Sequence, residues 1–368
     1  MRALKDIYAD NSRIRLRTSI VPLLAKDGKW TILRPANPLR VQSSPLINSI
    51  FQNISRELPI KQLIEIVSED TNRTYDSVLR ALELIAAKGL IFEERDAPSF
   101  EDENGRYARQ IDQFAQYESS SMSRFDYQSR IRHASLTQIG VGGLGTWITM
   151  NLAMAGIGEL NLVDGDTVEK SNLNRQILYD QSEIGALKAS VAARKLHTLN
   201  PDVKTRFDPI FIHSQKDAEA AIPNHTNLVI LSADEPLMKL RVWVSEACYK
   251  KQIPLLMVAS GGVGPLIEPN SITSCWHCQE LYLEEVHPEI RDWLAEIDSA
   301  SRGGLPQGIY PGYHSLMAGL VMIETIKFIT GMQVPQSKGA ILVWNQGSST
   351  ITREVLPVHP KCERHEHA

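Results

Sequence analysis

The stretch SLTQIGVGGLGTWITMNLAMAGIGELNLVDGD, residues 135–166, decides the fold. An apolar run ends at Ile139 and a helical pattern begins near Gly143. The glycines around this junction have the spacing G-x-G-x-x-G and are Gly140, Gly142 and Gly145. Asp164 follows the last of them by nineteen residues, after a second apolar run. A strand, a glycine turn, a helix and an acidic residue in this order predict a βαβ unit that binds a nucleotide.

The glycine turn is suited to a phosphate group. A Cβ would keep the backbone away from the phosphate, and the following helix presents free N–H groups and the positive end of its dipole. The spacing alone does not say whether the nucleotide is a nicotinamide dinucleotide used for hydride transfer or ATP used for another reaction.

The composition is that of a soluble globular protein with two or three domains. The chain has 368 residues, of which 43% are hydrophobic and 22% are charged. The N-terminus carries charges throughout, without an apolar signal core, so we expect a cytoplasmic protein that does not bind a membrane. Four cysteines are too few and too unevenly spaced for a disulfide framework, which favours metal binding.

Charge divides the chain into two modules. Residues 1–92 contain 14 Lys and Arg against 9 Asp and Glu, a net charge of +5, so the remainder carries −9 of the total of −4. Between the two parts lies an acidic segment with Pro98 and Gly105 and little apolar periodicity. We therefore expect a first domain over 1–93, a linker over 94–105 and a second domain over 106–368.

The sequence of the first module predicts strands, then three helices and a final strand. The turn KDGK, with Asp27-Gly28 at its tip, lies between two β-forming runs, and three amphipathic segments follow. This order predicts a small α+β, winged-helix-like domain. Such a domain with a positive charge can bind DNA, dock a peptide along a strand edge, or serve as an interface. Nothing in the sequence resembles a long basic recognition helix.

The residues after Asp164 favour phosphate chemistry over hydride transfer. The segment DGDTVEKSNLNRQILYDQSEIGALKA supplies a dense set of polar groups, namely Asp164, Asp166, Asn172, Arg175, Gln176 and Lys188. When a carboxylate attacks the α-phosphate of ATP, negative charge develops on the phosphoryl oxygens and on the departing pyrophosphate. Arg, Lys and a magnesium-binding carboxylate must then converge on that charge.

Three of the four cysteines suggest a structural zinc site. Cys275 and Cys278 have zinc-knuckle spacing, and Cys362 with His365 would complete a tetrahedral Cys3His site. The fourth ligand is open at this point, because His277, His359 and His367 are nearby alternatives.

These motifs together resemble the adenylating enzymes of the ThiF, MoeB and ubiquitin-activating family, over about residues 104–365. The motifs that carry the resemblance are RYARQ at 106–110, GVGGLG at 140–145, DGDTVEKSNLNRQ at 164–176, Lys188, SADEP at 232–236 and CWHC at 275–278. The resemblance implies a Rossmann-like α/β adenylation domain with a mixed, mainly parallel sheet, preceded by the winged-helix-like peptide-recognition domain. The zinc site departs from the family, in which the second ligand pair is usually also Cys-x-x-Cys.

The resemblance also implies roles for single residues. Asp164 would hold the ATP ribose, Arg175 and Lys188 would contact the phosphates, Asn172 would orient the triphosphate, and Asp234 would bind Mg²⁺. The remaining ATP contacts would come from Gly140, Gly142, Gly143, Gly145, Asp166 and Gln176.

Arg109 would reach into the ATP site of a partner subunit, so the resemblance implies a homodimer in which Arg109, Arg175, Lys188 and Asp234 are catalytic. Family members that form a thioester need a cysteine in or near the crossover loop, expected at 284–310, and this segment contains none. Cys248 is instead predicted to be a small buried hydrophobe. The chain is therefore not expected to transfer a ubiquitin-like protein through a thioester.

The added N-terminal module resembles that of the branch that modifies ribosomally made peptides, such as the enzymes that mature microcin C and pantocin A. The resemblance implies adenylation of a precursor-peptide carboxylate in antibiotic biosynthesis, including activation of glutamate side chains before cyclisation as in pantocin A. Activation of the peptide C-terminus, adenylation of the C-terminal glycine of a sulfur-carrier protein, and a non-catalytic leader-binding scaffold are the alternatives. No nucleic-acid partner is expected.

Overall fold

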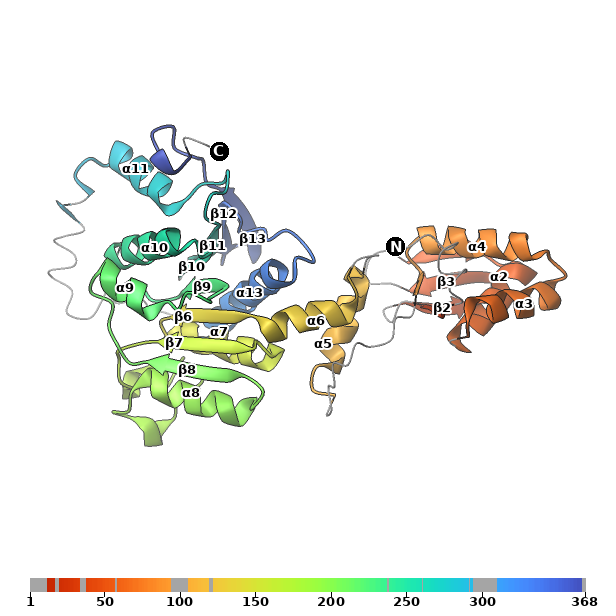
Figure 1. Ribbon diagram of the computed structural model, residues 1–368, viewed down its shortest axis with the longest axis horizontal. Helices are drawn as coiled ribbons and strands as arrows, with labels where there is room; N and C mark the ends of the chain where they lie inside the picture. Colours follow the sequence, from red (N-terminus) through yellow and green to blue (C-terminus); the bar gives the residue numbers. More distant parts are fainter. Residues whose placement is uncertain are drawn as a thin grey trace. The chain divides into compact units, whose positions relative to one another are not determined.

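The protein was analysed as a computed structural model that describes residues 12–16, 20–33, 38–56, 58–93, 105–118, 122–236, 238–259, 261–290, 292–293 and 310–365. Internal packing divides the chain into two compact units, residues 1–129 and 130–368, which are described separately (Figure 1). The expected domain limits, 1–93 and 106–368, stay predictions. Residues 94–104 of the expected linker lie outside the described residues.

A three-stranded antiparallel sheet opens the first unit. Its strands, in the order β2-β3-β4, are Val21–Leu24, Lys29–Leu33 and Leu39–Gln42. The predicted turn at Asp27-Gly28 connects β2 to β3, and the Lys29 N–H donates to Asp27 Oδ1 at 3.2 Å. Gly28 has φ of +76°, a conformation that favours glycine. The predicted hairpin is confirmed.

Three helices and a short two-stranded sheet complete the core of this unit. The helices are α2 (Pro45–Asn53), α3 (Ile60–Thr71) and α4 (Tyr75–Ala87). The strand β1 (Ile14–Leu16) pairs antiparallel with β5 (Ile91–Glu93). Helix residues such as Ile50, Leu63 and Leu82 are fully buried together with Ile32 of the sheet. Two further helices follow, α5 (Ala108–Phe114) and α6 (Arg124–His133), the second of which crosses the division between the units.

A mixed eight-stranded sheet forms the second unit, as predicted. Its order is β13-β12-β11-β10-β9-β6-β7-β8. The strands are β6 (Ser135–Ile139), β7 (Glu159–Val163), β8 (Lys204–Asp208), β9 (Leu228–Leu231), β10 (Leu255–Ala259), β11 (Gly262–Ile267), β12 (Ala340–Asn345) and β13 (Thr350–Val355). The five strands from β10 to β8 are parallel, whereas β11, β12 and β13 each pair antiparallel with the preceding strand.

Helices cover both faces of this sheet. They are α7 (Gly143–Ala155), α8 (Lys188–Leu199), α9 (Gln215–Ala221), α10 (Lys239–Lys251), α11 (Trp276–Val286) and α13 (Pro311–Thr330). Helix α7 packs beside α8 and α13, and α9 packs beside α10 (Figure 1). Every residue of β6 and β9 is buried, as expected for central strands covered on both sides. Among the described residues, no helix has both the length and the hydropathy needed to span a membrane.

The strand order reverses between β6 and β9. The chain runs from β6 outward through β7 to β8, and then returns to β9 on the other side of β6. In an open α/β sheet, ligands bind at the carboxyl ends of the strands where the order reverses. The glycine turn after β6 lies at this point.

Candidate nucleotide and metal sites

Two glycines of the turn are needed for packing within the protein. Gly140 has φ of +95°, and a Cβ there would lie 2.6 Å from the Ala233 nitrogen. A Cβ on Gly145 would lie 2.3 Å from the Gly140 carbonyl oxygen. Neither position accepts a side chain, so α7 can start close against the ends of β6 and β9.

Gly142 is different, because the space beside it is open. A Cβ there would meet only Gln176 Nε2, at 3.9 Å. Gly142 is the N-cap of α7 and, as a glycine, offers no side-chain acceptor to the first N–H groups of the helix. An open backbone at the positive end of a helix is an anion-binding arrangement.

Buried polar side chains hold the turn in place. The Gln138 side-chain NH2 donates to the backbone carbonyl oxygens of Gly140 and Gly145, and the Thr149 hydroxyl donates to the side-chain oxygen Oε1 of Gln138. The Tyr179 hydroxyl donates to the Val141 carbonyl oxygen at 2.8 Å, and burial raises the pKa of this phenol. Sequence reasoning missed all three residues, although a glutamine within the buried strand β6 was a usable signal.

Asp164 lies directly at the turn. Its carboxylate accepts the Val141 N–H at 2.6 Å and the Asp166 N–H at 2.9 Å. Burial raises the pKa of Asp164, while these two N–H groups and the Lys188 ammonium oppose the shift. The carboxylate is thus fixed beside the glycines, where a Rossmann-like fold contacts a ribose.

Lys188 is the first residue of α8 and is 6% exposed. Its ammonium lies 2.9 Å from an Asp166 carboxylate oxygen, and its N–H donates to the Asp166 carbonyl oxygen. A cation at the positive end of a helix is unfavourable, and Asp166 offsets that cost. The ammonium also opposes the rise in the pKa of Asp164, so its charge is felt at the glycine turn.

Asp234 and Glu235 follow β9 at the same edge of the sheet and are exposed. Burial, Asp234 and Asp166 together raise the pKa of Glu235, whereas Lys188 lowers it, so these side chains share one electrostatic environment. A magnesium ion held by one carboxylate together with nucleotide phosphates is a common arrangement. Asp234 fits that role chemically.

The loop after Asp166 contributes Asn172, Arg175 and Gln176. Arg175 donates to the Ser171 carbonyl oxygen and to Asn174, and its own carbonyl accepts the Trp147 indole N–H. Asn172 is buried and its amide oxygen accepts the Glu169 N–H, so part of its role is to shape this loop. Gln176 is buried, and no described residue donates a hydrogen bond to its amide oxygen.

Phe211 was not predicted but lies at the same edge. A Cβ on Gly165 would be 2.6 Å from its ring, so the ring rests on the backbone between Asp164 and Asp166. The side chain is nevertheless 55% exposed. No local sequence pattern indicated a role for Phe211. Its position at the site follows from the fold, because Phe211 comes after the edge strand β8.

Arg109 lies exposed on α5 of the first unit, and its role in a partner subunit stays a prediction.

A second group of polar side chains gathers near the end of the chain. The ligand atoms of Cys275, Cys278, Cys362 and His365 all lie within 4.8 Å of one another. The Cys275 sulfur lies 3.8 Å from that of Cys278 and 3.7 Å from that of Cys362. Thiolates bound about 2.3 Å from a tetrahedral zinc ion lie roughly 3.8 Å apart. The residues therefore fit a zinc site closed by four protein ligands.

The structure also separates three of the four histidine alternatives. Both ring nitrogens of His365 are buried, and neither has a hydrogen-bond partner within the described ranges. His359 lies 3.2 Å from a Glu285 oxygen and accepts the Lys361 N–H, while His277 lies 3.5 Å from Glu280. His367 lies outside the described residues. Geometry thus favours His365 as the fourth ligand.

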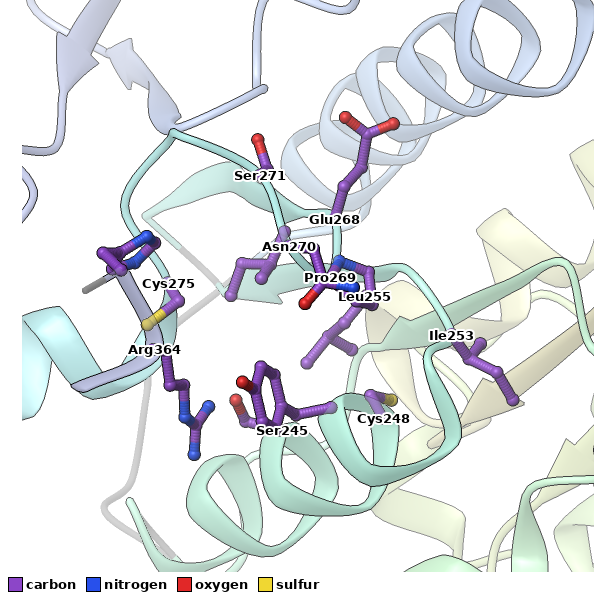
Figure 2. Close-up of a pocket in the computed structure, with 13 residues that line it drawn as sticks. Ser245, Cys248, Ile253, Leu255, Glu268, Pro269, Asn270, Ser271, Cys275 and Arg364 are labelled. Atoms are coloured by element: carbon purple, nitrogen blue, oxygen red, sulfur yellow. The ribbon is translucent and has the colours of Figure 1, made fainter. Parts of the chain in front are cut away.

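A small pocket adjoins the cysteine group (Figure 2). Its walls include Cys248 of α10, Cys275 and Arg364, and none of the 13 lining residues belongs to the glycine turn. Cys248 is 2% exposed, and burial raises its pKa to about 12, so its thiol is not ionised near neutral pH. The prediction that Cys248 is a buried hydrophobe is confirmed.

Comparison with known proteins assigns the chain to a family. Residues 107–364 match the ThiF family. The chain belongs to the ThiF family. It is accordingly an ATP-dependent adenylating enzyme, and the glycine turn with Asp164 and Lys188 is its candidate ATP site.

The curated relatives are adenylyltransferases. A sulfur carrier protein adenylyltransferase of Thermus thermophilus is 28% identical over 242 residues, which cover 64% of this chain and 83% of the relative. The adenylyltransferase and sulfurtransferase UBA4 of Saccharomyces cerevisiae is 28% identical over 258 residues. That match covers 69% of this chain, and the chain spans about half the length of the yeast protein, 53%.

Solved structures share the fold over almost the whole chain. E. coli MccB, solved with MccA-N7isoASN, has a TM-score of 0.76 and 21% identity and covers 96% of this chain and 99% of its own. PaaA has a TM-score of 0.71 and 24% identity and covers 92% of this chain and 98% of its own. At these identities the likeness concerns the fold.

Proposed function

We propose that the chain adenylates a carboxylate of a ribosomally made precursor peptide in antibiotic biosynthesis. An oxygen of the peptide carboxylate attacks the α-phosphorus of ATP, the bond from that phosphorus to the bridging oxygen breaks, and pyrophosphate leaves. The product is a peptidyl adenylate. Glutamate side chains of the precursor, activated before cyclisation, are the carboxylates we favour.

Each charged residue of the site has a place in this step. Arg175 and Lys188 would stabilise the charge that develops on the phosphoryl oxygens and on pyrophosphate. Asp164 would hold the ribose, Asn172 would help orient the triphosphate, and Asp234 would hold Mg²⁺, which supplies further charge neutralisation when bound. Arg109 would complete the site of a second copy in a homodimer.

The N-terminal unit is the observation that carries the choice of substrate. Its strands and helices up to Glu93 lie outside the family match, which begins at residue 107, and the T. thermophilus relative aligns with only 64% of this chain. MccB covers 96% of the chain, and its solved structures include one with the peptide MccA. A unit shared with a peptide-binding protein supports a peptide substrate. The sequence relatives favour a sulfur-carrier C-terminus as the second candidate.

The sheet of the first unit offers an edge for such a peptide. The Ala25 N–H donates to the Lys29 carbonyl oxygen, which sets the alternation of the β2–β3 ladder. In an antiparallel pair, outward and inward N–H groups alternate, so the nitrogen of Pro22 faces the open side of β2. Proline has no N–H, and this edge therefore lacks a donor.

The opposite edge of the sheet, at β4, keeps its backbone N–H donors. The same alternation directs the backbone groups of Arg40 and Gln42 away from β3, and both side chains are exposed. We propose that an extended acidic leader adds to β4, with Arg40 beside its carboxylates. The net charge of +5 over residues 1–92 suits such a ligand.

Two Arg40 variants test the proposed edge. Arg40→Ala removes the charge, whereas Arg40→Pro also removes the outward N–H and leaves the ladder to β3 in place. Precursor affinity measured by fluorescence anisotropy should fall moderately in the first and by about tenfold more in the second. Pro22→Ala, on the other edge, is the matched control and should bind normally. Equal affinities for all four proteins would contradict binding at β4.

ATP–pyrophosphate exchange tests the substrate. Exchange should depend on the precursor peptide, should persist when its C-terminus is amidated, and should disappear when its glutamates become glutamines. Loss of exchange on amidation alone would instead assign the activated carboxylate to the C-terminus. Exchange with a sulfur-carrier protein but not with any precursor peptide would establish the second candidate.

A further inference from the structure

His314, in the first turn of α13, touches the glycine turn. It is 6% exposed, and a Cβ on Gly143 would lie 2.5 Å from its Cε1, with both ring nitrogens within 3.2 Å of the same point. Gly143 is therefore a glycine because the imidazole occupies the space of a side chain. The ring lies beside the first residue of α7, where the helix N–H groups are free.

The Nδ1 atom of His314 is buried and has no hydrogen-bond partner among the residues that the structure describes. The amide oxygen of Gln176 is also buried and unpartnered, and its amide nitrogen faces Gly142 at 3.9 Å from the Cβ position. Two unsatisfied polar atoms thus flank the start of α7. A buried polar atom without a partner is unfavourable, so such atoms are expected where a ligand completes the hydrogen bonding.

The charge around His314 favours a neutral imidazole and an anionic ligand. Burial lowers the pKa of His314, and the positive charge of Arg175 lowers it further. A neutral imidazole carries one N–H donor and one acceptor nitrogen. The Arg175 guanidinium and the positive end of α7 together attract an anion to the place that Nδ1 adjoins.

We propose that His314 is a nucleotide-binding residue, and that its Nδ1–H donates to a phosphoryl oxygen of the ATP bound at the start of α7. This inference rests on the glycine turn being the ATP site. It needs no particular peptide, because the contact is to the nucleotide. His314 comes from α13, far along the chain from every residue predicted for the phosphates.

The test is ATP affinity, measured by calorimetry with Mg²⁺ and without peptide. His314→Leu should raise the Kd for ATP by about tenfold or more, the scale of a lost hydrogen bond to a charged group. His314→Asn, whose amide can replace Nδ1, should recover most of the affinity, whereas His314→Gln should recover less. Thr325→Val is the matched control, because its hydroxyl is also buried without a partner on α13. Its Kd should equal that of the wild type.

Three results would overturn the proposal. One is a folded His314→Leu protein with the wild-type Kd. Another is equal affinity of the Asn and Gln variants, which applies even if the Leu variant does not fold. The third is an unchanged Kd with a raised KM for the peptide alone. If the wild type binds ATP but no peptide supports exchange, the proposed substrate fails while the His314 contact is still measured by its Kd.

Discussion

The cysteine group and the candidate nucleotide site of the second unit differ in how completely protein atoms fill the positions around a ligand. In the cysteine group, four ligand atoms lie within 4.8 Å and three of their residues are buried thiols, so an ion would be enclosed by protein. In the candidate nucleotide site, Gly142 offers α7 no side-chain cap, Gln176 and His314 have atoms without a hydrogen-bond partner in the described part of the chain, and Asp234 is exposed. A closed set of ligands stabilises a fold, whereas an open set binds and transforms a substrate.

Removing a cationic side chain from the candidate nucleotide site should produce the largest change in turnover. Lys188→Ala and Arg175→Ala should each lower the rate of peptide-dependent AMP formation by on the order of a hundredfold or more, because each removes a preorganised partner of the developing charge. Folding should survive, since Arg175 is partly exposed and loss of the buried Lys188 ammonium leaves only the exposed Asp166 without its ion-pair partner. Measured kcat and thermal melting curves check both statements. A tenfold effect or less would show that the open site does not depend on these cations.

Breaking the closed site should instead lower stability. Cys275→Ser should remove stoichiometric zinc and lower the Tm by roughly 10 °C, because binding of a structural ion is coupled to folding. Turnover per folded molecule should stay within about twofold of the wild type. Elemental analysis and calorimetry provide the measurements. Cys248→Ala, in the same region, is the control and should keep both metal and turnover.

A selective loss of activity in a stable, zinc-free Cys275→Ser protein would erase the distinction between the two groups. Activity lost in Cys248→Ala would contradict the buried, protonated thiol described for this residue.

A smaller effect, on ATP affinity, is expected at Phe211, at the border of the candidate nucleotide site. Phe211 lies on Gly165 beside the proposed ribose carboxylate and exposes more than half of its ring. We expect it to stack on adenine, so Phe211→Ala should raise the Kd for ATP by about tenfold. Phe211→Tyr keeps the ring and should bind ATP normally. Equal Kd values for the Ala and Tyr variants would place the base elsewhere.

Local sequence patterns predicted the fold and much of the candidate site. The glycine spacing, Asp164 and the apolar strands around them follow from short-range chemistry. The mixed sheet was implied by the family resemblance, and that prediction is confirmed. Gln138, Phe211 and His314 were missed, because their positions at the turn depend on how distant segments pack. His314 in particular follows the turn by about 170 residues.

The cysteine group shows the same limit. The spacing of Cys275 and Cys278 predicted a half-site, but four histidines competed for the last position. Only the tertiary structure shows that Glu285 and Glu280 engage His359 and His277 while His365 joins the thiols.

The products of ATP test the central claim most directly. With the precursor peptide and Mg²⁺, the wild-type enzyme should convert ATP to AMP and pyrophosphate, and Lys188→Ala should slow this conversion on the order of a hundredfold. Release of ADP and phosphate would mean that the carboxylate is phosphorylated, and would contradict adenylation of the peptide.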